Sequence, residues 1–210
     1  MAITPIIVRD GNNAAQSMSA LQDPSGYNST TVSLDTGRAT YRAAGNFTPQ
    51  ATNAVTVLTI QGSATKTVRI KRIGLSGVST AIGQNVFQLL KTSALGAGGT
   101  PVTPTATPLD SASPAATAVV THYTASLKAT GTAIGGPLSM ANVTTCVTAV
   151  PATGVVPAQT TLFPEFGAPI GQAIVLRGAA QYLEVQNVLA ANLAAGTVLC
   201  YTVEWEEDNS

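Results

Sequence analysis

The chain of 210 residues has one histidine, His122, the side chain best suited to move protons near neutral pH. A catalytic histidine needs a nucleophile beside it and an acid that orients it. The Gly-x-Ser-x-Gly turn of serine hydrolases is missing, because Gly74-Leu75-Ser76-Gly77 has the wrong spacing. His122 also stands in a β-branched run, Ala118 to Thr124, that is typical of a strand. We therefore expect a strand histidine that is hydrogen-bonded to its neighbours.

The residue types that bind metals and phosphates are present without the spacing that such sites need. Cys146 and Cys200 lie far apart, and no Cys-x-x-Cys or His-x-x-x-His occurs. Gly96-Ala97-Gly98-Gly99 lacks the Lys and the Ser or Thr that complete a phosphate loop. The sequence thus predicts no metal, no cofactor and no enzymatic activity. The two cysteines either form one disulfide or are small buried apolar residues, and the second interpretation is favoured.

Charged residues gather in two places. Four of the ten basic residues fall within seven positions, and the C-terminal region is acidic. Such charges either form the solvent face of a strand or make an ionic contact with a partner, for example with the acidic end of a neighbouring copy. No aromatic residues are interleaved with the basic group, so stacking on nucleic acid is not supported. The candidate interface residues are Lys66, Arg69, Lys71, Arg72, Glu204, Glu206 and Glu207.

Charge is scarce overall: Asp, Glu, Lys and Arg make up 10% of the chain, and the net charge is zero. A typical soluble domain is about one quarter charged. No apolar run approaches the roughly 18 residues that would span a membrane, and no global basic field exists to hold nucleic acid. No basic segment followed by an apolar one opens the chain, which predicts assembly in a cytoplasm. We expect other protein to cover much of the surface.

Strand patterns recur along the chain, whereas helical periodicity is almost absent. The runs 55–60 and 66–75 are expected to form a hairpin, with a bulge where the alternation slips at Arg72-Ile73. Many short strands between turn clusters predict an all-β sandwich, of which a jelly roll is the expected variety. Further strands are expected at 85–91, 116–124, 172–177, 181–188 and 197–205.

Two segments fall outside this pattern. Residues 1–35 have turn clusters and only a short apolar opening, which predicts an extended N-terminal arm. Residues 93–115 are rich in Pro, Gly and Thr, which predicts a long loop inside a single sandwich domain of residues 36–210. We expect the arm and the loop to bind neighbouring subunits through extended backbone contacts.

Several sequence segments resemble those of small virion structural proteins of tailed bacteriophages. They are Ile60-Gln61-Gly62-Ser63-Ala64-Thr65-Lys66-Thr67-Val68-Arg69-Ile70, Ala173-Ile174-Val175-Leu176-Arg177-Gly178 and Tyr201-Thr202-Val203-Glu204-Trp205-Glu206-Glu207. The loop from Thr100 to Ser113 is similar in composition and place, and the resemblance extends over roughly residues 40–207. It implies a β-rich protein on the virion with no catalytic residues to carry over.

Composition narrows the expected place on the virion. Neither repeats nor heptads of a long fibre are present, and aromatic residues make up only 5% of the chain. These features favour a capsid cement or decoration subunit that bridges capsomers. Its expected partners are the major capsid protein and copies of itself, in a trimer, without nucleic acid or membrane. The alternative is a tail- or fibre-associated protein that binds the host surface.

Overall fold

The computed structural model describes residues 7–9, 15–17, 21–22, 28–29, 38–49, 55–79, 83–147, 166, 172–188, 193 and 196–209. The chain divides into two compact units, Met1–Arg38 and Ala39–Ser210. In the first unit, the described residues form two antiparallel strand pairs. These pair β1 (Ile7–Arg9) with β2 (Ala15–Ser17) and β3 (Leu21–Gln22) with β4 (Asn28–Ser29). The rest of the predicted arm lies outside the described residues.

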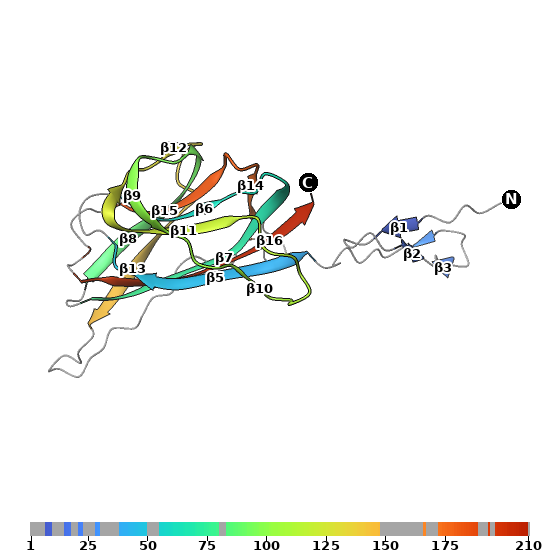
Figure 1. The fold of residues 1–210 in the computed structure, drawn as a ribbon, viewed down its shortest axis with the longest axis horizontal. Helices are drawn as coiled ribbons and strands as arrows, with labels where there is room; N and C mark the ends of the chain where they lie inside the picture. The colour runs from blue at the N-terminus through green and yellow to red at the C-terminus, as the bar shows by residue number, and fades with distance from the viewer. Residues whose placement is uncertain are drawn as a thin grey trace. The chain divides into compact units, whose positions relative to one another are not determined.

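The second unit is a sandwich of two sheets, which Figure 1 shows as two layers. The five-stranded sheet contains β10 (Thr107–Pro108), β5 (Ala39–Phe47), β16 (Val198–Asn209), β7 (Lys66–Ser79) and β14 (Ile174–Arg177). The seven-stranded sheet contains β13 (Ser139–Val147), β8 (Gly83–Ala94), β15 (Tyr182–Asn187), β6 (Val55–Gln61), β11 (Val119–Lys128), β9 (Gly98–Val102) and β12 (Thr132–Ala133).

The predicted all-β sandwich is thus confirmed, and the described residues contain no helix. Pairing within each sheet is antiparallel. At one edge, β13 also pairs in parallel with β7 over Cys146 and Val147, which joins the two layers. The jelly-roll variety stays a prediction. In the described part of the chain, no helix is long and apolar enough to cross a membrane.

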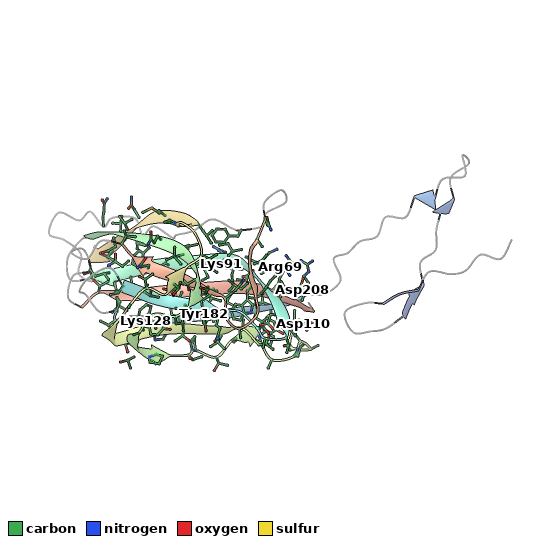
Figure 2. All side chains as sticks on the ribbon, turned by 90° about the horizontal axis from the view of Figure 1, so that it is seen from above. Arg69, Lys91, Asp110, Lys128, Tyr182 and Asp208 are labelled. Atoms are coloured by element: carbon green, nitrogen blue, oxygen red, sulfur yellow. The ribbon has the colours of Figure 1, made fainter. Side chains whose placement is uncertain are left out.

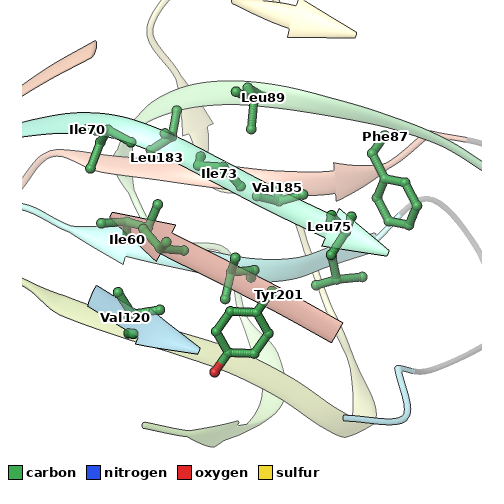
Figure 3. Close-up of a cluster of buried hydrophobic side chains, with 14 of the residues drawn as sticks. Ile60, Ile70, Ile73, Leu75, Phe87, Leu89, Val120, Leu183, Val185 and Tyr201 are labelled. Atoms are coloured by element: carbon green, nitrogen blue, oxygen red, sulfur yellow. The ribbon is translucent and has the colours of Figure 1, made fainter. Parts of the chain in front are cut away.

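The core lies between the two layers and is built by alternation along the strands. In β7, Val68, Ile70, Ile73 and Leu75 are buried, and the residues between them lie on the outer face. Trp205 from β16 is fully buried in the same core. Figure 3 shows a cluster of these side chains contributed by strands of both sheets.

The seven-stranded sheet is covered on both faces over part of its width. Residues 55–60 of β6 and 183–187 of β15 are buried without alternation. One face packs in the core, and the outer face lies beneath segments that follow β8 and β11. Ala129 donates its N–H to the Ala97 carbonyl at 2.9 Å, which joins these two segments. Such a strand cannot be recognised by period-2 alternation.

The expected hairpin of residues 55–60 and 66–75 is wrong. β6 lies in the seven-stranded sheet and β7 in the five-stranded sheet, so the turn between them crosses from one layer to the other. Several polar contacts hold this turn. The Gly62 N–H donates to the Gln181 carbonyl at 2.8 Å. The Ser63 hydroxyl accepts the Lys66 N–H at 3.1 Å. Gly62 and Ser63 therefore predict the turn correctly, but they do not determine which strands pair.

The expected bulge is confirmed. Glu204 of β16 lies opposite Arg72, and Trp205 lies opposite Ile70, so Lys71 is the extra residue in β7. Lys71 and Arg72 consequently both face outward, and the alternation resumes in the opposite phase at Ile73. The bulge at Lys71 therefore places the apolar side chains before it, such as Ile70, and after it, such as Ile73, on the same core face.

The other five expected strands are present as β8, β11, β14, β15 and β16. Two long strands, β5 and β13, were not expected from the sequence, because Ala, Gly and Asn give them weak strand propensity. The expected loop 93–115 also differs from the structure. It contains the short edge strands β9 and β10, which pair with β11 and β5.

Candidate interaction surface

The outer face of the five-stranded sheet carries a cross-strand ladder of opposite charges. On β16, Glu204, Glu206 and Asp208 alternate with buried residues and face outward. The neighbouring β7 presents Arg69, Lys71 and Arg72 on the same face. Opposite charges on adjacent strands attract, and each pair stabilises a sheet modestly. Figure 2 shows Arg69 and Asp208 close to each other on this side.

Ion pairs between described residues join the strands on this face. The Arg69 Nε lies 3.0 Å from Asp208 Oδ2, and the Lys71 Nζ lies 3.3 Å from Glu206 Oε1. The third pair joins a strand that sequence reasoning missed: Arg42 Nη2 of β5 lies 2.6 Å from Glu204 Oε2. Both Arg42 and Arg72 stand opposite Glu204 in register.

The basic group and the acidic end therefore contact each other within one chain. Six of the seven candidate interface residues take part in such pairs, and Arg72 is exposed beside them. The remaining pair, Lys66 Nζ and Glu207 Oε2, is 3.9 Å apart, and Glu207 is buried. A contact between this face and a partner stays a prediction.

Glu207 is a buried carboxylate at one end of the core. Its Oε1 accepts the N–H groups of Thr117 at 2.9 Å and Ala118 at 2.8 Å, and the indole N–H of Trp205 at 3.0 Å. Its Oε2 accepts the Thr117 hydroxyl at 2.6 Å. The carboxylate thus fixes the start of β11 against the end of β16. These contacts indicate a structural role.

His122 is the hydrogen-bonded strand histidine that the sequence predicts. It is buried on β11, its Nδ1 shares a hydrogen bond with the Tyr201 hydroxyl at 3.0 Å, and its ring stacks on Phe47 with 4.7 Å between centroids. Burial lowers the pKa of His122 below 6.5 and raises the pKa of Tyr201 to about 12. Both groups are therefore neutral at pH 7.

A second buried carboxylate, Glu184, lies on the outer side of the seven-stranded sheet. It accepts the hydroxyls of Thr56 at 2.6 Å and Thr92 at 3.0 Å, from the strands on either side. It also accepts the Gly131 N–H, at 3.2 Å to each oxygen. A Cβ at Gly131 would collide with the Ala94 carbonyl and with this carboxylate. Glu184 thereby holds the segment between β11 and β12 onto the sheet.

The seven-stranded side of the sandwich presents almost no charge. Its strands contain three residues of the types Asp, Glu, Lys and Arg, whereas the strands of the five-stranded sheet contain ten. Glu184 and Lys128 are buried, and the Lys128 amine donates to the Gly96 carbonyl. Lys91 donates to the Val175 carbonyl of β14 at 2.8 Å. Residues 92–109 and 129–147 contain no charged residue at all.

Most of the exposed apolar side chains, six of the seven in the described part of the chain, lie in these uncharged segments. All seven large hydrophobic residues that are exposed in the described part of the chain fall between residues 95 and 140. Six lie in strands of the seven-stranded sheet or directly next to them, and Leu109 lies beside β5. They are Leu95, Val102, Leu109, Val119, Ile134, Leu138 and Met140. Apolar patches without charge are typical of protein–protein contacts.

Two further sequence-based expectations concern cysteines and metals. Cys200 is a free thiol on the exposed face of β16, so the expectation that it is buried is wrong. The side chain of Cys146 lies outside the described residues. Within the described ranges, no three His, Cys, Asp or Glu side chains gather in a way that could hold a metal ion.

Comparison with known proteins finds no matching family model, no matching curated protein and no matching solved structure. The function of the chain is therefore inferred from its own residues and their arrangement in the fold.

Proposed function

We propose that this chain is a structural virion protein of a tailed bacteriophage, a capsid cement or decoration subunit that stabilises the head by bridging capsomers. In this role the chain acts by contact and performs no reaction. Its partners are the major capsid protein and further copies of the chain, in a trimer assembled in the host cytoplasm. A tail- or fibre-associated protein that binds the host surface is the alternative.

One observation carries this proposal: ten charged residues lie in the strands of one sheet and three in those of the other, and six of the seven exposed apolar residues in the described part of the chain lie in or beside the strands of the sheet with little charge. The charged side keeps most of its groups in ion pairs within the chain. The uncharged side presents Leu138 and Met140, which are 50% and 55% exposed. Apolar side chains that stay exposed to water contribute no free energy of stabilisation to an isolated protein. In a subunit of a shell, the same side chains are buried against neighbouring subunits and stabilise the contact.

Labelling of intact particles with antibodies against this chain tests the proposal. Gold particles over the head, at regular capsomer spacing, are the expected result. Label confined to tails or fibres would instead establish the alternative. Label on neither part would remove the chain from the virion and would overturn both.

A second experiment measures what the subunit does for the head. Particles that lack the chain are expected to release their DNA at a lower temperature than complete particles, and added purified chain is expected to restore the difference. Deletion of residues 1–30 tests the predicted role of the arm: the sandwich should still fold, and binding to the stripped heads should be lost. Unchanged binding would exclude that role.

A further inference from the structure

The outer face of the seven-stranded sheet is divided into a covered half and an open half. Over the covered half, Gly131 and its neighbours lie on Glu184 and Thr92. The open half consists of the outward positions of β8 and its neighbour β13, which pair over seven residues. Its members are Gln84, Val86, Gln88, Met140, Asn142 and Thr144, and none of them is charged.

Apolar side chains border this open half along β8. Leu138 donates its N–H to the Leu89 carbonyl at 2.8 Å, and Ile134 donates its N–H to the Lys91 carbonyl at 2.7 Å. Both side chains are exposed, as is Met140, which lies opposite Gln88. The "β8–β13 patch" is here the open half together with Ile134 and Leu138. Backbone pairing with β8 fixes it in place.

We infer that the β8–β13 patch is the contact surface between copies of this chain. A surface without charge cannot compensate a charged partner, and burying unpaired charges against it is strongly unfavourable. Its partner must therefore be uncharged as well. The same patch on another copy meets this condition, and contact between identical surfaces closes an oligomer. The outer face of the five-stranded sheet does not fulfil this condition, because it is charged.

The biological role of this contact rests on the proposed function. The contact itself can be tested separately, because self-association of the purified chain is measurable without a virion. We expect the purified full chain to sediment as a dimer, because contact of the patch with the same patch on another copy has two-fold symmetry. Leu138→Glu and Met140→Glu place a carboxylate in the contact and should weaken self-association about 30-fold or more. Because both residues are half exposed, the variants should keep the thermal midpoint and the β-sheet circular dichroism of the wild type.

Leu109→Glu is the matched control. Leu109 is 53% exposed, against 50% for Leu138, but lies beside β5 and outside the patch. It should leave the mass of the oligomer unchanged. A third variant within the patch, Met140→Lys, should weaken self-association as Met140→Glu does, and mixing the two Met140 variants should restore association through opposite charges. A simple folding defect would not be rescued in this way.

A monomeric wild type over the whole concentration range would overturn the inference, and so would equal effects of Leu138→Glu and Leu109→Glu. A mixture of the two Met140 variants that stays monomeric would exclude contact of patch with patch. An oligomer that fails to bind heads would leave the inference intact and contradict the proposed function. A monomer that binds heads would do the reverse.

Discussion

Trp205 donates its indole N–H to the carboxylate of Glu207, two residues further along β16, at 3.0 Å. Both side chains are buried at the same end of the core. The carboxylate accepts the Thr117 and Ala118 N–H groups at the same time, so one side chain ties together β16, the core tryptophan and the entry to β11. We regard this group as the polar anchor of the sandwich.

Replacing Glu207 is expected to destabilise the protein strongly. Glu207→Ala leaves the N–H groups of Trp205 and Ala118, which are buried, and that of Thr117 without an acceptor, and should lower the free energy of unfolding by about 3 to 5 kcal/mol. Glu207→Gln keeps one acceptor oxygen and should cost less. Glu206→Gln is the control, because Glu206 lies on the outer face of the same strand, and its loss should cost at most about 1 kcal/mol. Denaturant unfolding measures all three, and equal effects at 206 and 207 would contradict the anchor role.

The charge ladder predicts a measurable but small coupling between β7 and β16. In a double-mutant cycle of Arg69→Ala and Asp208→Ala, we expect a coupling energy of about 0.5 to 1 kcal/mol, because the pair is partly exposed to solvent. High salt should reduce it, since screening weakens partly exposed pairs. The control is a second double-mutant cycle, in which Arg72→Ala replaces Arg69→Ala, because Arg72 is exposed on the same face. A coupling that does not respond to salt would show that charge is not its source.

Local patterns were sufficient for the class of fold and for one fine detail. The phase slip in β7 could be recognised because Val68 and Ile70 alternate in one phase and Ile73 and Leu75 in the other. Strand pairing could not be recognised. The turn at Gly62 and Ser63 is compatible with a hairpin or with a crossing between layers, and only the tertiary position of Gln181 decides between them.

The candidate surface was only partly accessible to sequence reasoning. The basic and acidic groups were visible, but their mutual pairing depends on β7 and β16 being neighbours, which is a property of the whole fold. Arg42 was missed because β5 contains Ala43, Ala44 and Gly45, a weak strand signal. The uncharged side had a readable signal, since residues 129–147 contain no charge, but its significance depends on the placement of β13 beside β8.

Glu184 is expected to act as a latch for the segment that covers the seven-stranded sheet. Glu184→Gln removes half of the acceptor capacity facing Thr56, Thr92 and Gly131, and should accelerate hydrogen exchange of the Gly131 amide. The Ala129 amide, which donates to the Ala97 carbonyl, is the internal control and should change less. Equal acceleration of both amides would indicate general destabilisation in place of a local latch.

Stability should also depend on His122 in mildly acid solution. Burial lowers the pKa of His122 in the folded state below 6.5, so the unfolded state takes up a proton first as the pH falls. Stability from this group is therefore complete above pH 6.5 and decreases below it, by at most about 1.4 kcal/mol per pH unit, until the pH passes the folded-state pKa. Tyr201, with a pKa raised to about 12, stays protonated throughout.

His122→Gln isolates this effect, because glutamine can still form a hydrogen bond with Tyr201 and does not titrate. The carboxylates are common to both proteins, so their contribution cancels in the difference between the two unfolding free energies measured by urea titration. That difference should be constant above pH 6.5 and should shift in favour of the variant as the solution becomes more acid. A difference that is independent of pH would mean that His122 titrates alike in the folded and unfolded states, contrary to its burial between Phe47 and Tyr201.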